Sequence, residues 1–467
     1  MTSATRGNYR PDTPTVRTFH DARVQFLEGQ DTPSDYLERC FATIDEREPQ
    51  VQAWVTLNRD VATREAEAAS QRYRAGQPLS PIDGMPVGIK DVIQTADMPT
   101  TLGSPIFEGR HTHMDSASVN ALRRAGASIV GKTVTTEFAF VEPGPTTNPF
   151  CAEATPGGSS SGSAAAVGAG MVPAALGNQV VGSVIRPAGY CANFAIKPTQ
   201  GALHCGEGLS LSQLHLGVHA ASLQDMWSVT HAIAQDAGAD PGYPGLYGPA
   251  TMAAPMQPRS LVVLETEGWA QCDDVTRGVF EELLEQVASH GVQLVRRAEH
   301  PAVERFERAS AASVSLCRVI CSYELRWAFR QYQATGKLSN AMGIWLEMAE
   351  TLKPVDYRDA LHQRAALRAD MAALRQVADA AIMLTAPGSA PALGQRVPSG
   401  ESAYSFVTGS PASTAHTSLT GAPAISVPLL AINGLPVGVQ LVGHAHDDWQ
   451  LAGYAGWLHG RCEPVVR

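Results

Sequence analysis

The residues of this chain that could do chemistry are concentrated in one segment rich in serine and glycine. The segment reads Pro-Gly-Gly-Ser-Ser-Ser-Gly-Ser over residues 156–163 and is followed, later in the chain, by Gly182 and Ser183. Small residues at this density let backbone strands approach closely and leave hydroxyl and amide groups facing one cavity. A serine hydroxyl attacks a carbonyl carbon only when a base removes its proton. The segment therefore predicts nucleophilic catalysis and requires a base from elsewhere in the chain.

Three interpretations compete for these serines. Residues 158–162 match the G-x-S-x-G nucleophile elbow, with Ser160 as nucleophile, but that elbow follows a hydrophobic strand and here it follows a loop-like stretch at residues 146–156. A glycine-rich turn before a helix can cradle phosphate, but the longer nucleotide-binding motifs do not occur here. The third interpretation is a Ser/Ser/Lys system, for which Lys90 at the end of the apolar run Val87–Ile89 supplies an amine.

Lys90 can serve as a base only in its neutral form. An unperturbed lysine has a pKa of about 10.4 and is protonated at pH 7. Burial among apolar neighbours disfavours the charged form and lowers that pKa. We therefore expect the Lys90 amine to be desolvated at the end of its strand.

Alternating helix and strand signals would position these residues. The pattern predicts an α/β fold whose central mixed, largely parallel twisted sheet is covered by helices on both faces. A long stretch at 303–378 reads as almost wholly helical, which predicts a helical insertion or cap. The expected strands are 84–91, 128–131, 261–264, 292–295 and 380–384, and the expected helices include 61–73, 116–124 and 275–289.

The chain is interpreted as a single catalytic domain over residues 1–467. We expect N-terminal helices at 1–75, a catalytic core at 80–240, a helical insertion or cap at 300–380, and the C-terminal part of the core at 380–467.

The composition and charge restrict the class of partner. Of the residues, 44% are hydrophobic and 17% charged, which is a globular balance. The net charge of −10 disfavours a nucleic-acid-binding surface. No apolar tract reaches the ~20 residues that a membrane-spanning helix needs, and the first 18 residues lack the apolar core of a secretory signal. We expect a cytoplasmic protein that acts on a small molecule, with no nucleic-acid or membrane partner.

Several separate blocks of the sequence together resemble the amidase signature family. The resemblance covers roughly residues 20 to 460 and is weakest between about 240 and 370. It implies the amidase signature fold and amide hydrolysis by a Ser-Ser-Lys triad, with no cofactor and no metal. The blocks are Gly84–Asp91, Pro156–Gly162, Gly182–Ala188, Lys197–Thr199, Leu419–Pro428 and Gly434–Gly443.

The resemblance assigns a role to each residue of the triad. Carried over position by position, Lys90 is the general base, Ser159 the bridging serine that relays protons, and Ser183 the nucleophile, so that Ser160 is not. The resemblance also implies a cis peptide bond between Gly158 and Ser159. The oxyanion hole would consist of the backbone N–H groups of Val180, Val181, Gly182 and Ser183.

The turn before the nucleophile departs from the common family pattern. Many relatives read Gly-Thr-Asp-Thr-Gly-Gly-Ser where this chain reads Gly-Asn-Gln-Val-Val-Gly-Ser over residues 177–183. Val181 replaces a glycine, and a β-branched residue disfavours a positive φ, so the hole is distorted if the loop requires that geometry. Gln179 replaces an acid and cannot form an ion pair with Arg186, although its amide can still form hydrogen bonds. The following Ser-Val-Ile-Arg-Pro-Ala resembles one branch of the family, and we interpret the chain as a divergent but active member.

Other side chains near these blocks have two interpretations each. Ser160 either supports the site by hydrogen bonding or, with Ser161, caps the next helix. Phe138, Phe140 and Val141 either form one wall of the acyl pocket or belong to the ordinary core. The paired histidines at 111/113 and 444/446 could suggest a metal hydrolase, but their loop-like surroundings favour solvated side chains.

The sequence thus predicts a serine amidohydrolase that works through an acyl-enzyme. Its substrate would be a carboxamide, or a related aryl amide, ester or carbamate (urethane). The alternatives are the A-type subunit of a glutamine-dependent amidotransferase and a catalytically inactive scaffold. A homodimer is compatible with the resemblance, because dimers are common among relatives.

Overall fold

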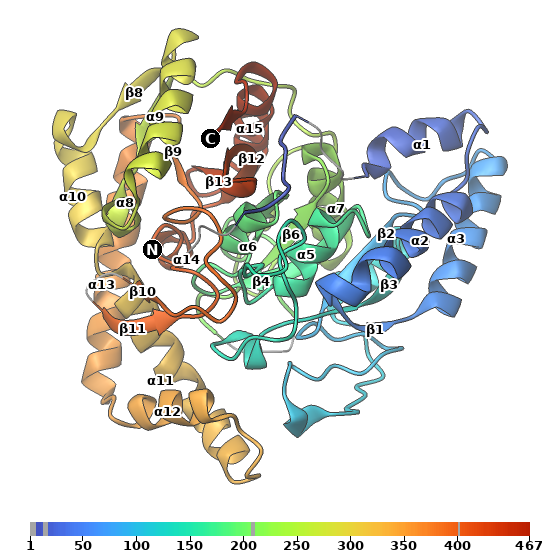
Figure 1. Cartoon of the computed structure of the whole chain (residues 1–467), viewed down its shortest axis with the longest axis horizontal. Coiled ribbons are helices and arrows are strands. Elements are labelled where there is room, and N and C mark those ends of the chain that lie inside the picture. Colours follow the sequence, from blue (N-terminus) through green and yellow to red (C-terminus); the bar gives the residue numbers. More distant parts are fainter. Residues whose placement is uncertain (1–5, 13–16, 207–210, 400–401) are drawn as a thin grey trace.

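The computed structural model describes residues 6–12, 17–206, 211–399 and 402–467, and most of its strands form one large twisted sheet (Figure 1). A separate two-stranded ribbon consists of β10 (Val397–Ser399) and β11 (Ser402–Phe406). The strands of the large sheet are β1 (Trp54–Leu57), β2 (Pro86–Lys90), β3 (Ser128–Thr133), β4 (Ala174–Gln179), β5 (Phe194–Lys197), β6 (His215–Ala220), β7 (Ser260–Val263), β8 (Gln293–Val295), β9 (Ala380–Leu384), β12 (Ala424–Ile432), β13 (Leu435–Val442) and β14 (Val465–Val466).

The sheet is mixed, and its parallel strands lie toward the two ends. Its order is β1-β3-β2-β4-β6-β5-β12-β13-β9-β7-β8, with β14 beside β12. Parallel pairing joins β3, β2 and β4 on one side and β9, β7 and β8 on the other, whereas the strands from β4 through to β9 pair antiparallel. The prediction of a mixed sheet is therefore confirmed, and parallel pairing predominates only outside the middle.

A tight hairpin contributes to the antiparallel middle. The turn between β12 and β13 is Asn433-Gly434, and both residues have positive φ, 52° and 70°. Asn-Gly with two positive φ angles is the turn that reverses a chain between adjacent strands with the correct twist. This local signal makes consecutive strands antiparallel where a helical crossover would have made them parallel.

Helices cover both faces of the sheet (Figure 1). The described residues also form the 3₁₀ turns η1 (Pro105–Phe107), η2 (Glu137–Ala139), η3 (Arg297–Glu299) and η4 (Leu374–Gln376). The α-helices are α1 (Phe19–Leu27), α2 (Pro33–Val51), α3 (Arg59–Arg74), α4 (Ala117–Arg124), α5 (Ser161–Gly168), α6 (Ile185–Tyr190), α7 (Leu223–Ala237), α8 (Thr266–Ala270), α9 (Asp274–Ser289), α10 (Pro301–Ser310), α11 (Ser313–Gln333), α12 (Asn340–Glu350), α13 (Pro354–Ala373), α14 (Ala415–Thr420) and α15 (Asp448–Arg461).

Helices α10 to α13 occupy the stretch that the sequence predicts to be helical. The expected strands and helices elsewhere are also present, and their ends agree with the expected ones to within two residues. The division of the chain into N-terminal, core, insertion and C-terminal segments stays a prediction. No helix in the described ranges is long and apolar enough to cross a membrane.

The two faces of β2 show how the sheet positions the site. Val87 and Ile89 belong to the large core that contains Trp227 of α7. Gly88 points the other way, toward Thr133 and Ala175, because successive side chains of a strand alternate between faces. Lys90 follows the same alternation as Gly88 and ends the strand on the face that carries α5. The next parallel strand, β4, ends beside it at Gln179.

Candidate active site

Lys90 is fully buried at the end of β2, with 0% of its surface exposed. Its Nζ lies 2.8 Å from Ser159 Oγ, 2.6 Å from Asn178 Oδ1 and 3.4 Å from the Asn178 carbonyl oxygen. Within the described ranges, none of the ion pairs of the chain involves Lys90. Burial lowers the pKa of Lys90 well below its usual value, because an unpaired ammonium is poorly solvated there. The surroundings thus favour a neutral amine in contact with a serine hydroxyl.

The backbone next to Ser159 is held by the buried guanidinium of Arg186. The Gly158–Ser159 peptide bond is cis, as the resemblance implies. Arg186 donates from Nη2 to the Gly158 carbonyl at 2.7 Å and to Thr408 Oγ1 at 3.1 Å. Burial lowers the pKa of Arg186 to about 10, so the group stays cationic at pH 7. Arg186 therefore anchors the backbone immediately before the bridging serine.

Ser183 lies two residues before the start of α6, and it lines a small cavity together with Ser159. The volume of this cavity is about 10 Å³, which is room for about one water molecule. The other residues that line it are uncharged: Ala139, Phe140, Asn178, Val180, Leu211 and Leu214.

The turn that leads to Ser183 has ordinary backbone geometry. No residue from 180 to 183 has a positive φ, so the β-branched side chain of Val181 imposes no left-handed strain. The expected distortion therefore does not arise. Gly182 is required for a different reason, because a Cβ there would lie 2.2 Å from Thr414 Oγ1. The N–H groups of Val181, Gly182 and Ser183 have no hydrogen-bond partner among the described residues.

Gln179 forms hydrogen bonds, and none of those found within the described ranges is to Arg186. Its Oε1 accepts from the N–H groups of Val184 and Ile185 at 3.0 and 3.1 Å. Its Nε2 donates to Thr417 Oγ1 at 3.3 Å and to Ser418 Oγ at 3.1 Å. The amide thus connects the first turn of α6 to α14.

Ser160 supports the backbone of the site and does not cap α5 through its side chain. Its Oγ donates to the Asn178 carbonyl oxygen at 3.4 Å, and its N–H donates to the Ser183 carbonyl oxygen at 3.3 Å. Ser161 donates from Oγ to the Val134 carbonyl oxygen at 3.3 Å. The supporting interpretation of Ser160 fits these contacts, and the capping interpretation does not.

Of the three apolar residues expected at the acyl pocket, Phe140 alone is found to line the cavity in the described part of the chain. Phe138 packs instead on Phe329 and Tyr332, with ring centroids 4.9 and 5.2 Å away. Val141 is half-buried against the same core. These contacts fit the core interpretation for Phe138 and Val141, and the lining of the cavity fits the wall interpretation for Phe140. Phe138 and Ala139 both have positive φ, so the chain turns sharply and only some of its side chains face Ser183.

The histidine pairs lie outside the site. His111 and His113 stack on one another with ring centroids 4.2 Å apart, and His444 contacts the Ala378 carbonyl oxygen at 2.8 Å. A different histidine, His219, is fully buried near Lys90, and burial lowers its pKa to about 3. A neutral imidazole adds no charge to the surroundings of the amine.

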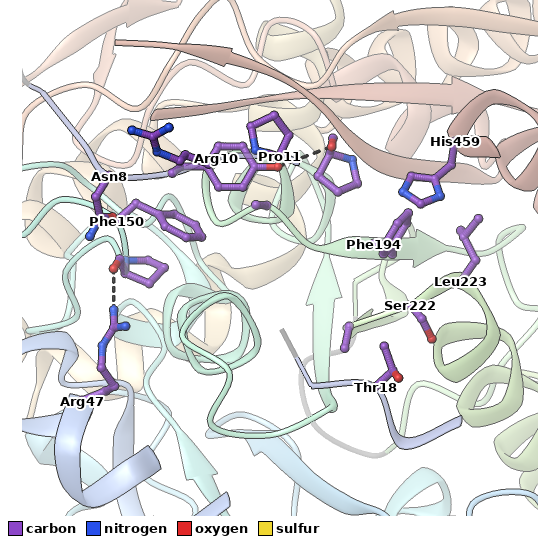
Figure 2. Close-up of a pocket in the computed structure, with 15 residues that line it drawn as sticks. Asn8, Arg10, Pro11, Thr18, Arg47, Phe150, Phe194, Ser222, Leu223 and His459 are labelled. Carbon is purple, nitrogen blue, oxygen red and sulfur yellow. Dashed lines mark hydrogen bonds between the residues drawn. The ribbon is translucent and has the colours of Figure 1, made fainter. Parts of the chain in front are cut away.

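A larger hollow of about 350 Å³ lies elsewhere (Figure 2). Phe194 and His459 lie side by side in its wall, and Phe150 and Arg47 lie on the opposite side of the view (Figure 2). None of Lys90, Ser159 and Ser183 lines it. The size of a cavity alone would therefore not identify the site that contains Lys90, Ser159 and Ser183.

The sequence does not predict a functional role for Asn178, although its Oδ1 lies 2.6 Å from the Lys90 amine. It is adjacent to Gln179 and comes from the end of β4, which pairs parallel with β2. Because parallel neighbours end at the same edge of a sheet, the order of the strands would have placed it beside Lys90. The spacing of the motifs does not give that order.

Comparison with known proteins gives a consistent result over nearly the whole chain. A family model described as Amidase matches residues 35–452. In Chloroflexus aggregans, the A subunit of the glutamyl-tRNA(Gln) amidotransferase is 32% identical over 92% of this chain and 93% of that protein. A solved structure described as an amidase has 26% identity and a TM-score of 0.81, covering 96% of this chain and all of that one. The native peptide amidase of Stenotrophomonas maltophilia, at 24% identity, shares the fold with a TM-score of 0.79 over 97% of this chain and 99% of that one.

Proposed function

The chain belongs to the amidase signature family, a family of hydrolases that act on carbon–nitrogen bonds, and from this premise we propose that it cleaves an uncharged amide through an acyl-enzyme on Ser183. Lys90 is the general base in this proposal, and Ser159 carries protons between the amine and the nucleophile. The reaction requires no cofactor. The observation that carries the proposal is the buried Lys90 amine, which lies 2.8 Å from Ser159 Oγ and has no carboxylate partner among the described residues.

The hydrogen bonds around Lys90 suit a neutral amine. A neutral amine has two N–H groups and one lone pair, and Asn178 offers two oxygen acceptors, at 2.6 and 3.4 Å. The lone pair is then free to accept the Ser159 proton. As Ser159 gives up that proton it takes the proton of Ser183, whose oxygen attacks the carbonyl carbon of the substrate.

The negative charge of the tetrahedral intermediate needs donors that are already in place. The unpartnered N–H groups of Val181, Gly182 and Ser183 supply them in this proposal, and each such donor is typically worth about 2.7–4 kcal/mol in the transition state. When the C–N bond breaks, the Lys90 ammonium returns its proton through Ser159 to the leaving nitrogen. Water then hydrolyses the acyl-enzyme by the same proton path, which releases the acid and restores Ser183.

The lining of the cavity supports an apolar acyl group as the substrate class. Phe140, Val180, Leu211 and Leu214 present hydrocarbon next to Ser183. Among the described residues that line the cavity, none carries a charge that could pair with a carboxylate or ammonium of the substrate. Aryl or hydrophobic amides, esters and carbamates therefore fit better than small polar amides.

Covalent labelling and a substrate panel test this proposal. A fluorophosphonate probe should modify Ser183, as located by peptide mapping, and the Ser183→Ala variant should remain unlabelled. Ser160→Ala is the matched control and should still be labelled at Ser183. Hydrolysis of p-nitroacetanilide, a fatty amide, malonamide and an aryl carbamate then ranks the substrates. Labelling of Ser160, or no labelling of the unaltered protein, would contradict the proposal, and the second result would favour an inactive scaffold.

The second candidate is a component of an amidotransferase complex, and the curated relatives favour it. Two proteins named as the A subunit of the glutamyl-tRNA(Gln) amidotransferase, from Chloroflexus aggregans and Staphylococcus epidermidis, are 32% and 28% identical to this chain. This candidate predicts glutamine hydrolysis that depends on a tightly bound partner protein. In the described part of the chain, the lining next to Ser183 is uncharged. This favours the stand-alone hydrolase, because free glutamine carries two charged groups that need partners. Glutaminase activity that appears only in a heteromeric complex would reverse this preference.

A further inference from the structure

In the turn from Val180 to Ser183, every carbonyl group accepts a hydrogen bond. If the proposed function holds, these hydrogen bonds determine how the turn presents its N–H groups to the substrate. The Val180 carbonyl accepts from Gln213 Nε2 at 2.7 Å, and the Val181 carbonyl accepts from Ser418 Oγ at 3.2 Å. The Gly182 carbonyl accepts from the Arg186 N–H at 3.0 Å. The N–H groups on the same peptide planes have no partner within the described ranges.

A trans peptide unit is planar, so its C=O and N–H groups point in opposite directions. Holding the Val180 carbonyl therefore fixes the direction of the Val181 N–H. Holding the Val181 carbonyl fixes the direction of the Gly182 N–H in the same way. Gln213 and Ser418 thus control the orientation of two N–H groups that neither of them touches.

Ser418 can hold its carbonyl only if its own hydroxyl is oriented. A serine hydroxyl has one proton, and here that proton goes to the Val181 carbonyl oxygen. The Ser418 oxygen must then accept, and Gln179 Nε2 donates to it at 3.1 Å. Thr417 repeats the arrangement, because its hydroxyl donates to the Thr414 carbonyl oxygen at 2.7 Å and accepts from the same Nε2.

A carboxylate at position 179 could not replace this amide. It would accept from Val184 and Ile185 as Gln179 Oε1 does, but it has no proton to give to Ser418 or Thr417. It would also place a negative charge beside the turn where the reaction develops one. The side chains of Gln179, Gln213 and Ser418 are all buried, so water cannot easily replace a lost bond.

We propose that Ser418 and Gln213 are positioning residues that aim the Gly182 and Val181 N–H groups at the oxyanion, and that Gln179 orients the Ser418 hydroxyl. The three residues come from α14, from the segment before β6, and from the end of β4. The turn is held from outside because its own N–H groups must stay free for the substrate. None of the three touches the reacting atoms.

Kinetics on purified full-length variants test the proposal. Ser418→Ala and Gln213→Met should each lower kcat for p-nitroacetanilide by about 10-fold, with little change in KM, because a misaimed donor weakens only the transition state. Ser418→Thr keeps a hydroxyl and should retain most of the activity. Ser426→Ala, a buried serine of β12 whose hydroxyl has no partner in the described structure, is the matched control and should behave as the unaltered protein.

Two further measurements separate positioning from a loss of structure. A trifluoromethyl ketone that forms a tetrahedral adduct should bind about 10-fold more weakly to Ser418→Ala and Gln213→Met, in proportion to the loss in kcat. Gln179→Glu should lower kcat, and adding Ser418→Ala to it should lower kcat little more, because both changes break one chain of hydrogen bonds. Rates are divided by the fraction of sites that a fluorophosphonate labels.

The outcomes are distinguishable from a failure of the proposed function. If the unaltered protein is not labelled at Ser183, the proposed function fails. If Ser183 is labelled and Ser418→Ala and Gln213→Met keep full kcat and full affinity for the ketone, the positioning inference is wrong. It is also wrong if kcat/KM falls only through KM.

Discussion

Two lysines on neighbouring strands are both fully buried, and they differ in what surrounds the amine. Lys90 ends β2 and Lys132 lies in β3, each with 0% exposure. Lys132 forms an ion pair with Asp91 at 3.1 Å and donates to Thr100 Oγ1 at 2.7 Å. Lys90 contacts Ser159 and Asn178, and none of the ion pairs in the described ranges involves it. Burial lowers the pKa of both amines, and at Lys132 the Asp91 carboxylate opposes this lowering.

The register of the strands explains why Asp91 pairs with the lysine that is more distant in sequence. Ile89 is opposite Lys132, and Lys90 is opposite Thr133. Residues opposite each other share a face, and successive residues alternate, so the two amines lie on opposite faces of the sheet. Asp91 continues the alternation onto the face of Lys132. The comparison teaches that burial alone does not make a base: the amine must also be kept away from a carboxylate.

Lys90→Met should cause the largest loss of activity. Removing the base should lower the labelling rate of Ser183 and the rate of amide hydrolysis by about 10⁴-fold or more, with no recovery up to pH 10. The thermal unfolding temperature should stay the same or rise, because methionine suits an apolar site better than an amine. Near-normal turnover in this variant would show that the base is another group.

Lys132→Met should have the opposite profile. It leaves Asp91 buried without its ion pair, which costs about 3–5 kcal/mol of unfolding free energy. Turnover per labelled site should remain within a few-fold of the unaltered protein. The double variant Lys132→Met/Asp91→Asn is the control and should recover most of the stability, as measured by urea unfolding. A large loss of turnover per site with stability intact would break the distinction between the two lysines.

The residues that the sequence could predict are those whose motifs are local. Lys90, Ser159 and Ser183 each lie in a short block that resembles a family pattern, and the strand signal around Lys90 predicted its burial. Phe138 and Val141 show the limit of this reasoning. They are neighbours of Phe140 in sequence, but positive φ angles at Phe138 and Ala139 turn the chain so that Phe140 faces the cavity and they do not.

The residues that the sequence could not predict act across long separations. Gln213 and Ser418 are 33 and 237 residues away in sequence from the carbonyl groups that they contact, and Asn178 reaches Lys90 because β4 pairs with β2. Their types are common and their spacing carries no signal. The antiparallel middle of the sheet has a different cause. The alternation of helices and strands predicts parallel neighbours, whereas the local Asn-Gly turn at residues 433–434 joins β12 and β13 as an antiparallel hairpin.

Asn178→Asp should turn Lys90 into a paired lysine like Lys132. A carboxylate at the present 2.6 Å contact favours the ammonium form, so the pKa of Lys90 should rise by about 1–3 units. Because the neutral amine is the active form, the acid limb of the kcat/KM profile should move to higher pH by the same amount. Activity lost at pH 7 should partly return at pH 9 to 10.

A matched variant separates this effect from a general cost of buried charge. Asn193 is buried and its amide contacts the Cys191 carbonyl oxygen, so Asn193→Asp introduces a carboxylate where no contact with Lys90 is found. Its pH profile should keep the original acid limb. An unshifted profile in Asn178→Asp would mean that Lys90 does not set the acid limb.

The smallest expected effect is on the pH dependence of stability. The folded pKa of Lys90 lies well below the ordinary lysine value, so between those two pKa values the unfolded chain binds a proton that the folded chain does not. Stability contributed at this position therefore rises with pH across that window, by at most about 1.4 kcal/mol per pH unit. Measured by urea unfolding, the unfolding free energy of the unaltered protein should increase relative to that of Lys90→Met as the pH rises from 7 to 9. The pKa of Lys132 is also lowered, so at that position too the rise in stability is confined to the window between its folded and unfolded pKa values. No rise at position 90 between pH 7 and 9 would mean that the Lys90 amine is not desolvated in the folded protein.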